Sequence, residues 1–118
     1  MKRILFITLV LLLFSACENK SKNIKPSRLL TEEEMIDIMT DVQIIEADIN
    51  RHKSNGDVIG DMPEVYYRQL FEHYGITDSI FAENLTYYTY DPATIERIMD
   101  SATERIIRQA KSIEEDSE

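Results

Sequence analysis

The stretch Thr31–Ile49, TEEEMIDIMTDVQIIEADI, decides the fold of this chain. Apolar residues recur along it at spacings of three and four: Met35, Ile38, Val42, Ile45 and Ile49. This spacing is typical of the apolar face of an α-helix. Thr31 and Glu34 stand three positions apart in front of the stripe, which is the pattern of a capping box at a helix N-terminus. The sequence therefore predicts a helix over residues 32–50.

A break and a second helix are expected next. Residues 51–62, RHKSNGDVIGDM, contain two pairs of turn-forming residues and are expected to form the longest loop. Pro63 suits the first position of a helix, and Gly75 suits a C-terminal cap. The second helix is therefore expected over residues 63–74.

Two more helices complete the expected domain. Thr77 is an N-cap for a helix over 78–89, and Asp91 with Pro92 opens the last helix over 92–113. The last helix carries a long apolar stripe: Ile95, Ile98, Met99, Ala102, Ile106, Ala110 and Ile113. No stretch alternates with the period of a strand, and the links between helices are short. We therefore expect an all-α, small four-helix bundle-like domain in which neighbouring helices pack antiparallel or as a corner.

The chain begins with MKRILFITLVLLLFSAC, Met1–Cys17. Two basic residues precede an uncharged apolar run, and small residues then precede the only cysteine. These are the zones of a secretory signal, and the apolar run is shorter than the about 20 residues that span a bilayer as a helix. Because the cysteine directly follows the small residues, the stretch resembles a bacterial lipoprotein signal. The resemblance implies cleavage before Cys17 and attachment of lipid to its sulfur.

These observations divide the chain into four parts. Residues 1–16 are expected to be the signal peptide, 17–30 the lipidated cysteine with a flexible polar tether, 31–113 the helical domain, and 114–118 an acidic disordered tail. No cofactor is expected besides the covalent lipid on Cys17.

The charge of the chain argues against nucleic acid as a partner. The full chain carries a formal charge of −9, and loss of Lys2 and Arg3 with the signal leaves −11. Such a body repels nucleic acid and anionic lipid headgroups. We therefore expect membrane attachment through lipid on Cys17, in the cell envelope and on the periplasmic side of an outer membrane.

Glu46 is a charged residue within the apolar stripe of the first helix. A carboxylate on an apolar face needs a partner or a raised pKa. We expect it to hold the register of the core through a hydroxyl or guanidinium group, with these candidate partners: Tyr66, Tyr67, Tyr74, Tyr88 and Arg105. The candidate interaction or core polar site comprises Glu46, Tyr67, Tyr74, Tyr87 and Tyr88.

The sequence offers no catalytic or metal-binding constellation. His52 and His73 lack the i, i+4 spacing of a helical zinc pair, so we expect His52 to be solvated and His73 half-buried. An acidic ridge beside the apolar stripe is interpreted as a solvated face: Glu34, Asp37, Asp41 and Asp48. No G-x-S-x-G, P-loop or G-x-G-x-x-G motif occurs. We therefore expect neither a metal site nor enzymatic activity.

Three stretches together resemble a known family: Lys25–Ile49, Val65–Phe81 and Tyr87–Pro92. The more specific parts are the residues Tyr67, Phe71, Gly75 and Ile76, the YYTYDP stretch, and the DVQIIEA stretch that contains Glu46. With its lipoprotein-like start, the chain is similar to the small lipoproteins of Bacteroidetes-type bacteria classed as domain of unknown function 4296. That family has no assigned activity, so the resemblance implies a fold and a location but no reaction.

Three functions remain open at this point. The leading hypothesis is a non-enzymatic envelope module that binds another protein, with Tyr87 and Tyr90 as surface aromatics. The alternative is binding of a small ligand, such as a lipid or glycan fragment, in a cavity lined by tyrosines. The third is a hydrolase that uses Glu46 with His73. Separately, two Asp-Ser-x triplets, at Ser79 and Ser101, resemble O-glycosylation sites of exported proteins.

Overall fold

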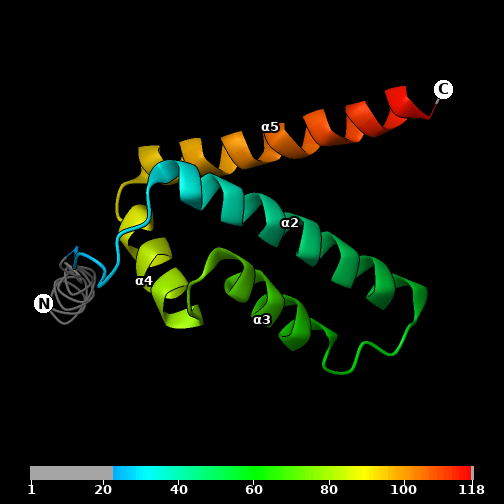
Figure 1. The fold of residues 1–118 in the computed structure, drawn as a ribbon, viewed down its shortest axis with the longest axis horizontal. Coiled ribbons are helices and arrows are strands. Elements are labelled where there is room, and N and C mark those ends of the chain that lie inside the picture. The colour runs from blue at the N-terminus through cyan, green and yellow to red at the C-terminus, as the bar shows by residue number, and fades with distance from the viewer. Residues whose placement is uncertain (1–22, 118) are drawn as a thin grey trace, which may run out of the picture.

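The computed structural model describes residues 23–117. Within them the chain forms four helices and no strand: α2 (Glu32–Asn55), α3 (Met62–Tyr74), α4 (Asp78–Thr89) and α5 (Pro92–Asp116) (Figure 1). The prediction of an all-α, four-helix bundle-like fold is therefore confirmed. The expected signal peptide, Cys17 and the tether up to residue 22 lie outside the described residues.

The helices begin where local capping chemistry predicts. The hydroxyl of Thr31 accepts a hydrogen bond from the Glu34 N–H at 3.1 Å, and the Glu34 carboxylate accepts one from the Thr31 N–H at 2.7 Å. The capping box is thus complete. Thr77 caps α4 through the Ile80 N–H, and Asp91 caps α5 with Pro92 at the first helical turn.

Two helices run further than expected. α2 continues through residues 51–55 and stops at Gly56, whose φ of 80° is left-handed, so the loop shrinks to residues 56–61. Contacts of Arg51 and His52 with Asp48, one turn earlier, support this extra turn. α5 continues to Asp116, and residues 114–116 are helical where a disordered tail was expected. The sequence after Pro92 contains no glycine or proline that would stop the helix.

The helices pack in two different ways around α2. α3 runs antiparallel to α2 on one side, whereas α5 lies on the other side and runs in the same direction as α2 (Figure 1). α4 crosses the end where α2 and α5 begin, which makes the corner that the short links predict. The core lies at this end and includes Met35, Ile38, Ile98 and Ala102. Farther along, α5 separates from α2 (Figure 1).

The segment before α2 belongs to the folded body. Pro26 and Leu30 are buried, although residues 17–30 were expected to form a flexible tether. Leu30 is 1% exposed and joins the core cluster. The prediction was wrong for residues 26–30, because the side chains of Asn84 and Tyr88 in α4 bind the backbone of this segment.

Candidate functional site

Residues 23–30, here called the entry segment, are bound to α4 by a buried asparagine. Asn84 is 0% exposed. Its side-chain oxygen accepts a hydrogen bond from the Leu30 N–H at 2.8 Å, and its amide donates to the Arg28 carbonyl at 2.8 Å. The same amide donates to the Ile80 carbonyl in its own helix at 2.8 Å. Asn84 therefore acts toward the entry segment as a neighbouring strand would, because it satisfies both a donor and an acceptor of the backbone.

A second set of contacts continues this attachment. The Tyr88 hydroxyl donates to the Leu30 carbonyl at 2.5 Å. Glu83 accepts two hydrogen bonds from Ser27, one from the N–H and one from the hydroxyl, both at 2.9 Å. These two donors, the backbone N–H first, hold the pKa of the Glu83 carboxyl below its usual range. The ionised carboxylate is thus the form that binds Ser27.

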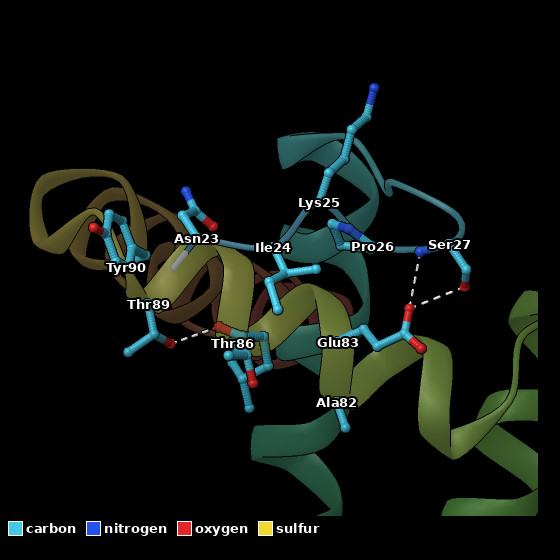
Figure 2. Close-up of a pocket in the computed structure, with 11 residues that line it drawn as sticks. Asn23, Ile24, Lys25, Pro26, Ser27, Ala82, Glu83, Thr86, Thr89 and Tyr90 are labelled. Atoms are coloured by element: carbon cyan, nitrogen blue, oxygen red, sulfur yellow. Dashed lines mark hydrogen bonds between the residues drawn. The ribbon is translucent and has the colours of Figure 1, made fainter. Parts of the chain in front are cut away.

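An open groove of about 1260 Å³ lies between the entry segment and α4. Its walls include Ile24 and Pro26 from the entry segment, and Ala82, Leu85, Thr86, Thr89 and Tyr90 from α4 and the turn after it. In Figure 2, Ile24 points toward α4 and Lys25 points away from it, and the Glu83 carboxylate accepts hydrogen bonds from Ser27. The groove therefore offers apolar side chains, a few hydroxyl groups, the amide of Asn23 and the base of the Lys25 side chain, and its carboxylate, Glu83, is already bound to Ser27.

Two side chains of this groove are unusually exposed for their type. Ile24 is 77% exposed and Tyr90 is 54% exposed. Large apolar and aromatic groups of this kind are characteristic of surfaces that contact another molecule. Tyr90, one of the two surface aromatics expected from the sequence, is thus on the surface, whereas Tyr87 is half-buried.

A different polar cluster joins α2 to α3. Three tyrosine hydroxyls of α3 donate to three carboxylates of α2: Tyr66 to Asp48 at 3.0 Å, Tyr74 to Asp41 at 2.7 Å, and Tyr67 to Glu46. Because the helices are antiparallel, the later tyrosine meets the earlier carboxylate. This arrangement fixes the register between the two helices.

The tyrosines of this cluster stay protonated at neutral pH. Burial, followed by the bond to Glu46, raises the pKa of Tyr67 to about 12. Burial and the bond to Asp41 also raise the pKa of Tyr74, and the bond to Asp48 raises the pKa of Tyr66. Each hydroxyl therefore donates a hydrogen bond to a carboxylate, and the three bonds hold α3 against α2.

Glu46 has one of the expected partners but not the expected surroundings. Its carboxylate accepts from Tyr67, yet the residue is exposed, so its placement in the core was wrong. The reason is the divergence of α5 from α2, which leaves the second half of α2 covered by α3 alone (Figure 1). A stripe that is buried around Met35 and Met39 is therefore open to solvent at position 46.

The five predicted site residues fall into two places. Glu46, Tyr67 and Tyr74 lie between α2 and α3. Tyr88 is buried under the entry segment, and Tyr87 packs edge-on against it with ring centroids 5.4 Å apart. The structure does not bring these two groups together into one site.

The histidines and the acidic ridge also differ from expectation. His52 is half-buried, with its Nδ1 2.7 Å from Asp57, whereas His73 is exposed and packs edge-on against Tyr74. Each histidine therefore has the environment that was predicted for the other. The extra turn of α2 carries His52 toward Asp57, which covers it in part. The acidic ridge is partnered rather than simply solvated: Asp41 and Asp48 bind tyrosines, Asp37 binds Arg105, and Glu34 caps its helix.

Asn84 is the residue that the sequence reading missed. It lies between Phe81, Leu85 and Tyr88 in the apolar pattern of α4. The same signal that singled out Glu46, a polar residue within an apolar stripe, marks Asn84 as well. Of the two, Asn84 is the one that is fully buried.

Two further properties concern the described residues alone. Among residues 23–117, no group of three or more His, Cys, Asp or Glu side chains is arranged to hold a metal ion. None of the helices in this range is both long and apolar enough to cross a membrane.

Comparison with known proteins gives one family. The model of the family described as domain of unknown function (DUF4296) matches residues 26–112. No curated protein and no solved structure matches the chain significantly. The match begins at Pro26, the first buried residue of the entry segment, so the family's domain includes the segment that binds Asn84. The chain belongs to the DUF4296 family.

Proposed function

We propose that this protein is a lipid-anchored module of the bacterial cell envelope that acts by binding another protein rather than by catalysis. The groove between the entry segment and α4 carries this proposal. It combines a large open volume with exposed Ile24 and Tyr90, and its carboxylate, Glu83, is engaged by Ser27. An acid–base reaction needs a free and positioned proton-transfer group, and this groove favours contact instead.

The position of the groove relative to the expected anchor supports the same proposal. Cys17 and the buried Pro26 are nine positions apart in the sequence, and at about 3.4 Å per position the chain between them spans about 30 Å at most. Lipid on Cys17 would therefore hold the groove close to the membrane. A partner located in or at that membrane would meet the groove at high local concentration.

Site-specific photocrosslinking in intact cells of the source bacterium tests this function. The full chain carries p-benzoylphenylalanine at Tyr90, with a matched probe at Val58, which is 97% exposed and lies in the loop between α2 and α3, away from α4. We expect an adduct with one envelope protein from position 90 but not from position 58. Ala82→Trp, which places an indole ring in the groove, should strongly reduce the adduct, whereas Val58→Trp should leave it. An adduct of undiminished yield in the Ala82→Trp variant would count against the proposal.

Lipid attachment is tested separately. Cells labelled with radioactive palmitate should yield a labelled wild-type protein and an unlabelled Cys17→Ser variant. If the wild type carries no label, the proposal of a lipid anchor on Cys17 is wrong. The crosslinking experiment still tests separately whether the groove binds a protein.

One observation favours a second candidate, the binding of a small ligand. A shallow pocket of about 550 Å³ lies between α2 and α3 and is lined by Ile44, Ile45, Leu70 and Tyr66, among others. This volume is within the range of about 300–1,000 Å³ typical of ligand pockets. Native mass spectrometry of the protein purified from membranes should then show a bound molecule that Ile44→Trp displaces. His73 also lines this pocket but Glu46 does not, so the geometry does not pair them for hydrolysis.

A further inference from the structure

The shallow pocket between α2 and α3, here called the α2/α3 pocket, is lined by one face of each helix. From α2 it receives residues at positions i, i+3, i+4 and i+7, which share one face of a helix: Asp41, Ile44, Ile45 and Asp48. From α3 it receives Leu70 and His73, among others. Because the helices are antiparallel, Asp41 lies at the end of the pocket where α3 finishes, and Asp48 lies at the end where α3 begins.

The middle of the α2/α3 pocket is apolar. Ile44 is 43% exposed, Ile45 is half-buried, and Leu70 of α3 is buried. An exposed isoleucine beside buried apolar side chains offers a ligand an apolar surface that it would remove from water. The middle of the pocket therefore suits a short alkyl or aryl group.

The two carboxylates of the α2/α3 pocket differ in how their charge is compensated. Arg51 donates a hydrogen bond to the Asp48 carboxylate, and Nε2 of His52 lies 3.8 Å from one of its oxygens. The hydrogen bond from Arg51 lowers the pKa of Asp48. Asp41 instead accepts a hydrogen bond from the hydroxyl of Tyr74, which is neutral. Among residues 23–117, no Lys, Arg or His side chain forms an ion pair with Asp41, so this end of the pocket keeps a negative charge.

We propose that the α2/α3 pocket binds a small amphiphilic cation, with its ammonium group at Asp41 and its apolar part on Ile44 and Leu70. The proposal names the ligand class for the second candidate function and rests on that function. Asp41 and Ile44 are three positions apart, or about 4.5 Å along the helix axis, so a short alkyl or aryl amine reaches both. An anionic ligand would meet Asp41 as a like charge, and a neutral ligand would leave its charge unpaired. The pocket therefore favours a cation over both.

Photolabelling with three matched probes tests the ligand class. Each probe has a hexyl chain with a terminal diazirine, and its head group is an ammonium, a hydroxyl or a carboxylate. The purified full-length protein is labelled with each probe, and mass spectrometry of its proteolytic peptides locates the label. We expect the ammonium probe to label the peptides that contain Ile44 or Leu70 about fivefold more than the hydroxyl probe does. The carboxylate probe should label them least, and unlabelled hexylammonium should compete with the ammonium probe.

Asp41→Asn tests the role of the charge. The amide oxygen can still accept the hydrogen bond from Tyr74, so the link between α2 and α3 is retained. Labelling by the ammonium probe should fall to the level of the hydroxyl probe. Asp100→Asn is the matched control, because it makes the same change at an exposed aspartate of α5 that lines neither the groove nor the α2/α3 pocket. Equal labelling of the Asp41→Asn variant and the wild type by the ammonium probe would overturn the proposal.

Ile44→Trp separates the ligand class from the pocket itself. The indole ring occupies the apolar middle of the pocket, so labelling of α2 and α3 by all three probes should decrease strongly. If the three probes label the wild type equally and Ile44→Trp removes the label, the proposed ligand class is wrong, although the pocket binds small molecules. Ammonium labelling that is unchanged by Ile44→Trp, or a label found only outside α2 and α3, would reject the pocket and the ligand class together.

Discussion

The side chain of Asn84 accepts a hydrogen bond from the backbone N–H of Leu30 at 2.8 Å, although the two residues are 54 positions apart in the chain. This bond, with the bond from Asn84 to the Arg28 carbonyl, closes the entry segment onto α4. It places residues 26–30 within the folded body and shapes one wall of the groove.

Replacement of Asn84 by alanine should destabilise the fold strongly. The change removes three hydrogen bonds and leaves the buried Leu30 N–H without its partner, at a cost of about 2–4 kcal/mol in the free energy of unfolding. Urea denaturation followed by circular dichroism measures this cost. Asn50→Ala, at an exposed position of α2, is the matched control and should change stability by no more than about 0.5 kcal/mol. Similar losses in the two variants would mean that the hydrogen bonds of Asn84 add no more to stability than an exposed amide does.

Tyr88→Phe tests the other hydrogen bond between α4 and Leu30. Only the hydroxyl that donates to the Leu30 carbonyl is lost, so we expect a decrease of about 1–2 kcal/mol in stability. Tyr90→Phe is the control, because Tyr90 is 54% exposed and its hydroxyl makes no hydrogen bond within residues 23–117. Thermal unfolding of the two variants should show a lower midpoint for Tyr88→Phe alone.

The bond between Tyr67 and Glu46 should contribute modestly to stability. Glu46 is exposed, so a double-mutant cycle of Glu46→Ala and Tyr67→Phe should give a coupling energy of about 0.5–1 kcal/mol. Glu46→Gln should cost less than Glu46→Ala, because the amide oxygen still accepts from the phenol. Strict additivity of the two single variants would show that the bond contributes nothing.

The contact between Glu83 and Ser27 should make stability depend on acid pH. The pKa of Glu83 is lowered in the folded state from its usual value of 4.5, so its contribution is fully present above that value. It is lost as the pH falls through the lower folded-state pKa. Glu83→Gln should therefore show a shallower loss of stability below about pH 4.5 than the wild type. Gln69→Ala, at an exposed position of α3 without an ionisable side chain, is the control and should leave the slope unchanged.

Much of the secondary structure could be predicted because its determinants are local. Thr31 with Glu34, Thr77, and Asp91 with Pro92 act within one helical turn, and each helix begins next to them. The helix ends were harder to predict. Gly75 ended α3 as expected, but residues 51–55 and 114–116 stayed helical.

The candidate site was only partly predictable. A tyrosine partner for Glu46 followed from the rule that a carboxylate on an apolar face needs a donor. The exposure of Glu46 did not follow, since it depends on the angle between α2 and α5. Nor did the groove, because residues 23–27 meet α4 only after the chain has passed through two other helices.

The sequence alone therefore determined that this chain forms four helices and, to within one residue, where each of them begins, because caps and apolar periodicity act over a few residues. The tertiary structure decided that the entry segment packs on α4, that Glu46 faces solvent and that residues 107–116 of α5 are exposed. These features depend on contacts between residues some 50 to 60 positions apart and on how two helices diverge, and neither leaves a local pattern in the sequence.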